Sequence, residues 1–132
     1  EICPSDTYHI SRYAVLLCYL GQPEKGLVQI ERALRLDPFC SDLVLETQGL
    51  CLYLLRQHKE ALSTFKKMQI ETRTSLFYGA ACNKALANHD IAKQMLKMAI
   101  SESEMTSEKF VSTQLFQDKR TSEELTEVLN SI

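Results

Sequence analysis

The fold is decided by residues 20–38, which read LGQPEKGLVQIERALRLDP. Pro23 suits the first turn of a helix, because the N–H group that it lacks has no helical partner there. Pro38 stops the same helix, since proline cannot continue it. Gly26 and Ala33 are small, and small side chains mark the face on which a second helix approaches closely. The stretch therefore predicts one helix between two prolines that packs tightly against a neighbour.

The same pattern recurs along the chain. Pro4 and Pro38 lie 34 residues apart. Small residues are expected wherever two helices approach, and they stand at Ala14, Gly26, Ala33, Gly49, Ala61, Ala80, Ala92 and Ala99. Three turn sequences give the same alignment, namely LGQPE at 20–24, LRQHK at 55–59 and LANHD at 86–90. The sequence therefore predicts a degenerate repeat, with a shortened connection at 69–72 that the residues there do not explain.

Apolar residues at helical spacing predict six helices, at 5–20, 23–36, 42–55, 58–69, 73–87 and 89–102. Side chains that can cap a helix precede two of them, Ser5 or Asp6 before the first and Ser41 or Asp42 before the third. No strand is expected.

The chain changes character after Ile100. A polar stretch follows, and two short amphipathic helices are then expected, one around Phe110, Val111, Leu115 and Phe116 and one from Ser122 to Leu129 with Thr121 or Ser122 as its cap. We expect helical repeats over 1–104, at about 7–41, 42–72 and 73–102, and a C-terminal capping segment over 105–132. Such a cap would cover apolar surface at the open end of the array.

Residues 2–100 resemble the tetratricopeptide repeat family through these prolines, turns and small residues. The resemblance implies an all-α fold, a right-handed α-solenoid of three antiparallel helix hairpins with a C-terminal capping helix or helices. It also implies a protein-protein interaction scaffold that binds a peptide or helix on its concave face. One subfamily clamps acidic chaperone peptides with lysine, asparagine and arginine, but the matching positions here are Ser11, Val15, Thr47, Thr74 and Tyr78. A chaperone co-factor role is therefore not implied.

A looser resemblance concerns residues 33–39, ALRLDPF. They look like the C-terminal repeat region of bacterial signalling regulators, in which the repeats follow a nucleotide cyclase or a winged-helix DNA-binding domain. This resemblance implies that the chain is the repeat module of a larger cytosolic signalling or regulatory protein. Because Ile2, Cys3 and Pro4 look like the end of a preceding repeat, we expect a fragment of a longer protein.

The composition excludes several function classes. The 132 residues carry a net charge of −2 with both signs interspersed, so we expect no nucleic acid to bind this segment. No apolar run approaches the roughly 18 residues of a membrane span, so no membrane partner is expected. The five cysteines, Cys3, Cys18, Cys40, Cys51 and Cys82, show no metal-binding spacing. They indicate reduced thiols and a cytoplasmic protein, although the number is also compatible with one disulfide.

The sequence contains no recognisable reaction centre. His9, His58 and His89 are the only histidines, and no two of them are spaced to place two metal ligands on one helix face. There is neither a glycine-rich phosphate loop nor a nucleophile elbow. We therefore expect no enzymatic activity, no metal and no cofactor.

Aromatic residues on the first helix of each pair suggest a binding groove. The residues expected to line it are Tyr8, Arg12, Tyr19, Leu50, Tyr53, Phe77, Tyr78 and Lys84. Tyr19, Tyr53 and Tyr78 are the expected anchors, because tyrosine offers a large area with a polar handle. An alternative is that these rings pack against a neighbouring helix, or against the C-terminal segment folded back over them.

Two other functions remain open at this stage. The repeats could self-associate as a homodimer and so dimerise a larger enzyme or transcriptional regulator. A small-molecule pocket could also lie between the C-terminal segment and the third repeat, where Asn83 occupies an apolar site. A buried asparagine more often satisfies a backbone group than a ligand.

Overall fold

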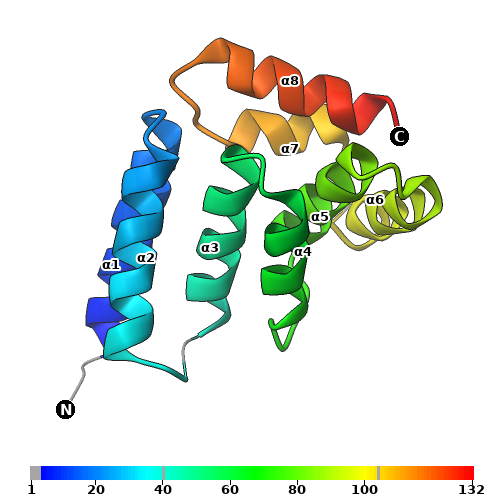
Figure 1. Cartoon of the computed structure of the whole chain (residues 1–132). Helices are drawn as coiled ribbons and strands as arrows, with labels where there is room; N and C mark the ends of the chain where they lie inside the picture. Colours follow the sequence, from blue (N-terminus) through cyan, green and yellow to red (C-terminus); the bar gives the residue numbers. More distant parts are fainter. Residues whose placement is uncertain (1–3, 40, 104) are drawn as a thin grey trace.

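The computed structural model describes residues 4–39, 41–103 and 105–132. These residues form eight helices and no strand, so the fold is all-α, as the sequence predicts. The helices, labelled in Figure 1, are α1 (Pro4–Tyr19), α2 (Pro23–Leu36), α3 (Asp42–Leu54), α4 (His58–Lys66), α5 (Arg73–Ala85), α6 (His89–Ser103), α7 (Ser107–Thr113) and α8 (Lys119–Asn130). None of the described helices has the length and apolar character needed to cross a membrane.

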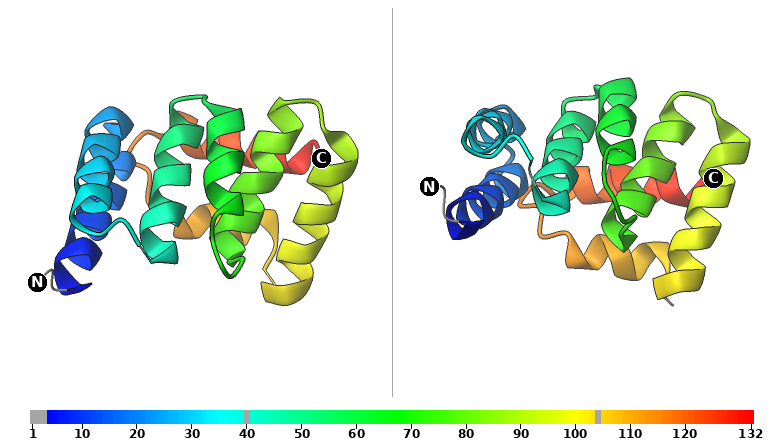
Figure 2. Two further views of the ribbon diagram at one scale, coloured as in Figure 1. Left: turned by 60° about the horizontal axis from the view of Figure 1, so that its bottom comes forward. Right: turned by 90° about the horizontal axis from the view of Figure 1, so that it is seen from below.

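The first six helices pack in chain order. α1 packs on α2, α3 on α4 and α5 on α6, while α2 also contacts α3 and α4 contacts α5. Figure 2 shows the resulting row, with α1 and α2 at one end and α6 at the other. α7 and α8 pack on each other and run across this row, and α8 also contacts α5.

The turns inside the three helix pairs share one backbone geometry. Each has a residue with positive φ, which is 79° at Gly21, 62° at Arg56 and 63° at Ala87. The N–H group of the next residue donates to a carbonyl of the preceding helix, from Gln22 to Leu17, from Gln57 to Leu52 and from Asn88 to Asn83, at 2.8, 2.9 and 2.8 Å. This pattern is the Schellman ending of a helix. The alignment of the three turns made from the sequence is therefore confirmed.

The small residues predicted at helix contacts are all buried. The alanines at 14, 33, 61, 80, 92 and 99 are 0 % exposed, and Gly26 and Gly49 are buried as well. At Gly49 a Cβ atom would lie 2.3 Å from the Phe65 ring, so α3 and α4 approach each other at a distance that only glycine permits. The small-residue pattern therefore identifies real helix contacts.

Contacts from α3 account for the short connection between α4 and α5. The carboxylate of Asp42, in the first turn of α3, accepts hydrogen bonds from the N–H groups of Gln69 and Ile70 at 2.9 and 3.0 Å. Thr72 then starts α5 in a capping box with Ser75. The connection is short because its middle is held by a helix of the same pair and its end is already a helix cap.

The caps predicted for two helices differ in the structure. α1 begins at Pro4, so both predicted caps, Ser5 and Asp6, lie inside the helix. Asp118 caps α8 by accepting the N–H of Arg120 at 2.9 Å, whereas both predicted caps, Thr121 and Ser122, lie inside the helix. Aspartate is one of the residue types that favour the N-cap position, so the sequence contained this signal.

Candidate functional site

The C-terminal segment, residues 105–132, lies against the first helix of each pair. Its backbone N–H at Gln117 donates to the carbonyl of Tyr19, at the end of α1, at 2.7 Å. The ring of Phe116 meets the ring of Tyr19 edge-on, with 5.3 Å between centroids. We call the surface formed by Tyr19, Tyr53, Phe77 and Tyr78, on α1, α3 and α5, the tail-contact face.

Phe110 of α7 occupies the centre of this contact. Its ring is stacked on Phe77 at 4.2 Å between centroids and meets the edge of Tyr78 at 5.6 Å. Phe110 is 0 % exposed, as are Phe77 and Tyr78. Because buried aromatic rings contribute much of the energy of a core or an interface, α7 is fixed to α5 mainly through this ring.

A hydrogen bond between Tyr78 and Gln114 accompanies the apolar contact of Phe110. The hydroxyl of Tyr78 donates to Oε1 of Gln114 at 2.8 Å. Burial raises the pKa of Tyr78 well above its usual value, so the hydroxyl keeps its proton at neutral pH. The ring of Tyr53 lies beside Tyr78, with 5.1 Å between centroids.

The structure separates the eight residues predicted to line a groove. Leu50, Phe77 and Tyr78 are buried in the main core, Tyr19, Tyr53 and Lys84 are half-buried, and Tyr8 and Arg12 are exposed. The four aromatic residues of the tail-contact face come together. Phe77 and Tyr78 lie under α7, which is the alternative in which the C-terminal segment folds back over the aromatics. A partner could reach these two rings only after the segment moved away.

The C-terminal segment also differs in place from the expected cap. It does not lie over the outer side of α6, where Ile91 and Met98 are 51 % and 41 % exposed. It extends from α5 to α1 instead, because its aromatic residues find partners on the tail-contact face. Leu115 was expected on a buried helix face but lies between α7 and α8 and is 71 % exposed.

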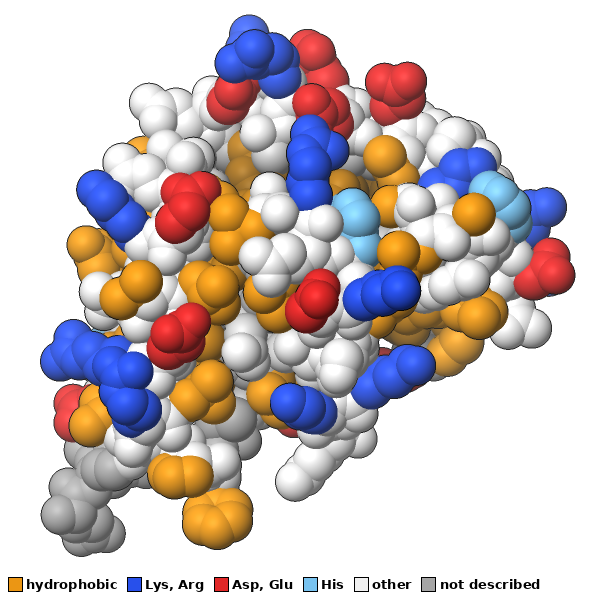
Figure 3. Space-filling view, in the orientation of Figure 1, with side chains coloured by type: hydrophobic (Ala, Val, Ile, Leu, Met, Phe, Trp, Pro, Cys, Tyr) orange, Lys and Arg blue, Asp and Glu red, His pale blue; other side chains and the backbone are white. Residues whose placement is uncertain are grey.

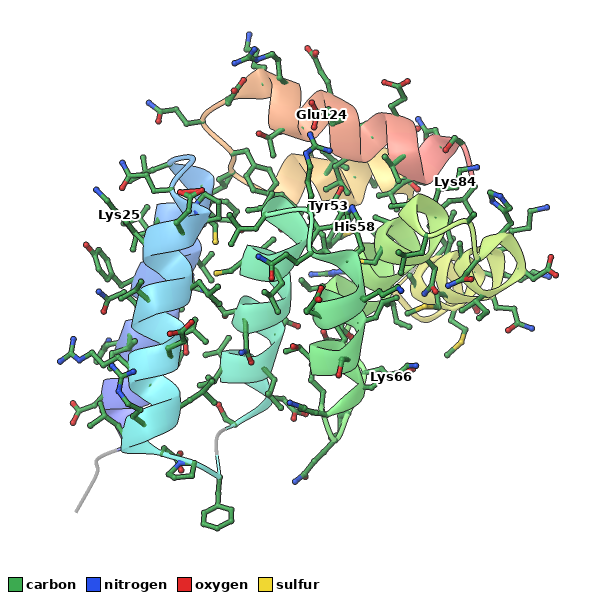
Figure 4. All side chains as sticks on the ribbon, in the orientation of Figure 1. Lys25, Tyr53, His58, Lys66, Lys84 and Glu124 are labelled. Carbon is green, nitrogen blue, oxygen red and sulfur yellow. The ribbon has the colours of Figure 1, made fainter. Side chains whose placement is uncertain are left out.

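An open cleft of about 760 Å³ remains beside α8. Figure 4 shows Tyr53 and His58 at the junction of α3 and α4, below Glu124 of α8, with Lys84 at the end of α5. Further lining residues come from the same turn and from α8 and its cap, among them Arg56, Asp118, Arg120, Glu127 and Val128. The cleft is thus the part of the C-terminal contact that is accessible to another molecule.

The charges around the cleft largely neutralise one another. Arg56 forms an ion pair of 3.3 Å with Glu124, and Arg120 forms one of 3.2 Å with Asp118. All four side chains are well exposed, so each pair contributes little to stability. Figure 3 shows the same mixture of signs over this face of the molecule.

The two ring side chains of the cleft are uncharged at neutral pH. Burial raises the pKa of Tyr53, while burial and the nearby Arg56 lower the pKa of His58. The buried Nδ1 of His58 has no hydrogen-bond partner within the described structure. Tyr53 and His58 therefore add no charge to the cleft.

Sequence reasoning placed Tyr53 and Lys84 at this site but missed Arg56, His58 and Glu124. The turn alignment already put Arg56 and His58 together at a helix junction. Nothing in the sequence indicated that α8 would cross above that junction, since this depends on the tertiary contact of Phe110.

Asn83 is satisfied within the protein. Its Nδ2 donates to the Gly79 carbonyl at 3.0 Å, and its Oδ1 accepts from Asn88 at 3.2 Å. It is 4 % exposed and does not line the cleft. The contact agrees with the expectation that a buried asparagine serves a backbone group.

No group of three or more histidine, cysteine or acidic residues in the described ranges is placed to hold a metal ion. Cys18, Cys51 and Cys82 are buried free thiols. Cys3 and Cys40 lie outside the described residues.

Comparisons with models of known protein families, with curated proteins and with solved structures find no match for this chain.

Proposed function

We propose that the chain is a protein-interaction module whose three helix pairs form a right-handed α-solenoid of tetratricopeptide type. The pairwise packing of α1 to α6, the repeated Schellman turns and the buried small residues support this architecture. Its function is to hold a peptide or helix of another protein on the tail-contact face, as part of a larger cytosolic signalling or regulatory protein. Such a role needs no catalytic group.

One observation carries the proposal. The tail-contact face already holds a segment with aromatic side chains, through the Phe77–Phe110 stack and the hydrogen bond from Tyr78 to Gln114. A surface that binds this chemistry within the chain also binds it in a separate molecule, once the internal segment is weakened. The partner is accordingly a short helical segment with aromatic residues and a hydrogen-bond acceptor between them.

A peptide of residues 105–132 with a fluorescent label tests the proposal. Phe116→Ala in the full chain removes the ring that meets Tyr19, at a half-buried position at the edge of the core. We expect the peptide to bind this variant and to bind the unaltered chain at least about tenfold more weakly, because a tethered segment competes at an effective concentration near millimolar. Fluorescence anisotropy measures both affinities.

Leu115→Ala is the matched control, since Leu115 is the neighbouring residue and is 71 % exposed. It should leave peptide binding as it is in the unaltered chain. If the peptide binds no variant while circular dichroism shows full helix content, the tail-contact face is not a docking surface.

Self-association is a second candidate, favoured by an apolar stripe on α1. Tyr13 and Leu16 of α1 and Leu20, the residue after its end, follow helical spacing and are 50 %, 51 % and 45 % exposed. A second copy that packs on this stripe would make the module a dimer. Light scattering over a range of concentrations should then show a dimer that Leu16→Glu converts to a monomer, whereas Ile70→Glu, at an exposed position away from α1, should not. A monomer at all concentrations would remove this candidate.

A further inference from the structure

Two buried thiols meet between α1 and α3. The Sγ atoms of Cys18 and Cys51 lie 3.4 Å apart, and the two residues are 1 % and 0 % exposed. They belong to different helix pairs. We propose that Cys18 and Cys51 form a disulfide under oxidising conditions, which makes this contact a modification site that joins the first two pairs covalently.

A glycine lies beside the two sulfur atoms. Gly26 of α2 lies against both, since a Cβ atom there would be 3.2 Å from Sγ of Cys51 and 3.4 Å from Sγ of Cys18. The missing side chain allows α2 to close over the thiols without entering the space between them. A disulfide is about 2.05 Å long, so the sulfur atoms have to approach by roughly 1.3 Å.

The oxidant is a low-molecular-weight disulfide such as oxidised glutathione. One protein thiolate attacks a sulfur of the oxidant and releases one glutathione thiolate, leaving a mixed disulfide on the protein. The second protein thiolate then attacks the protein sulfur of that mixed disulfide and releases the other glutathione. Two protein thiols are oxidised, one oxidised glutathione is reduced, and the two protons end on the released thiolates.

The burial of Cys18 and Cys51 determines how fast the two thiols are oxidised. The hydrogen bond with Cys51 and burial raise the pKa of Cys18 far above its usual range, and the thiolate is the reactive form. Reaction therefore waits for a transient opening of the helices. The site responds to sustained oxidation and not to a brief pulse.

The disulfide would lie close to the tail-contact face. Cys18 precedes Tyr19, whose ring and carbonyl contact Phe116 and Gln117. Joining Cys18 to Cys51 fixes α1 against α3 at the point where the C-terminal segment reaches α1.

The experiment uses the full chain with Cys3→Ser and Cys40→Ser, which leaves the thiols at 18, 51 and 82. The protein is equilibrated in glutathione buffers from the reduced and the oxidised side, once folded and once in concentrated urea. Mass spectrometry of peptides identifies the Cys18–Cys51 disulfide. We expect the equilibrium constant for its formation from oxidised glutathione to be at least about tenfold higher in the folded chain than in the chain unfolded by urea. The oxidised folded chain should also melt at a higher temperature.

Cys82 supplies the internal control, because it is also 0 % exposed but shares no hydrogen bond with a second thiol in the described part of the chain. Cys82 should stay reduced in the folded protein. Cys82→Ser should leave the equilibrium constant of the Cys18–Cys51 disulfide unchanged. Equal constants in the folded and the unfolded chain would overturn the proposal, as would cross-links that involve Cys82 as often as Cys51.

Discussion

The ring of Phe110 lies flat on the ring of Phe77, with 4.2 Å between centroids and 15° between planes. This stack joins the C-terminal segment to the third helix pair, so the segment is part of the core and not an appendage. Phe110→Ala should lower the free energy of unfolding by about 3–5 kcal/mol, since it leaves a cavity among buried rings. Urea denaturation measures the change, and a cost below about 0.5 kcal/mol, like that expected for the exposed Leu115→Ala, would mean that α7 is not part of the core.

The hydrogen bond from Tyr78 to Gln114 should have a smaller, separable effect. Tyr78→Phe keeps the buried ring and removes only the hydroxyl that donates at 2.8 Å. We expect a loss of about 1 kcal/mol in urea denaturation. Tyr78→Ala would empty a fully buried site, so it would test folding and not partner binding. Unchanged stability of Tyr78→Phe would show that the hydrogen bond adds nothing to the apolar contact.

The shared geometry of the three Schellman turns predicts that two substitutions change the free energy of unfolding in opposite directions. Ala87 has a φ of 63°, which an L-residue adopts at a cost, so Ala87→Gly should raise the free energy of unfolding by about 0.5–1 kcal/mol. Gly21→Ala should lower it by about 1 kcal/mol, although a Cβ atom at Gly21 meets nothing within 4 Å. Thermal or urea unfolding gives both values. Equal signs for the two substitutions would contradict the shared turn geometry.

Two helical glycines should respond differently to the same replacement. Gly49→Ala places a methyl group 2.3 Å from the Phe65 ring, which cannot move without disturbing the α3–α4 contact, and should cost about 1–3 kcal/mol. Gly79→Ala meets the terminal methyl group of Met95, also at 2.3 Å, but that side chain is flexible. Its cost should therefore be offset by the higher helix propensity of alanine. Comparable losses at both sites in urea denaturation would contradict this distinction.

The cleft should make stability depend on pH through His58. Burial and Arg56 lower the pKa of His58 in the folded protein, whereas in the unfolded chain it titrates near its usual value of about 6.5. Between the two values the unfolded chain binds more protons, so this contribution is complete above about pH 6.5 and is lost as the pH falls towards the folded pKa. Unfolding by urea at several pH values should show the loss, and His58→Gln should reduce the slope.

His89→Gln is the matched control, because His89 is exposed and is the first residue of α6, as His58 is the first residue of α4. It should leave the pH dependence unchanged. If His58→Gln also leaves it unchanged, burial of the imidazole does not contribute to stability.

Local signals explain which parts of this structure could be predicted from the sequence. Prolines, capping residues and small residues act within one or two helical turns, and they placed α1 to α6 within a few residues of their observed ends. The path of the C-terminal segment could not be obtained in this way. It depends on Phe110 finding Phe77 and Tyr78, a contact between residues far apart in the chain.

In the candidate site, too, local sequence signals predicted some features, while others depend on tertiary contacts. Tyr19, Tyr53, Phe77 and Tyr78 were expected at one surface because each lies on the first helix of a pair. The burial of Phe77 and Tyr78 was expected only as an alternative to an open groove, since a helix face that is covered by its own chain has the same composition as one that awaits a partner. The ion pair between Arg56 and Glu124 depends on α8 crossing above the turn.

The carboxylate of Asp42, which holds Gln69 and Ile70, bears on how such arrays vary in length. When the first turn of a helix holds the middle of a connection in this way, the length of the connection no longer sets the distance between the helix pairs on either side. Residues can then be gained or lost in the linker while the neighbouring units keep their positions. Irregular repeat periods in a sequence of this kind are thus compatible with a regular arrangement in space.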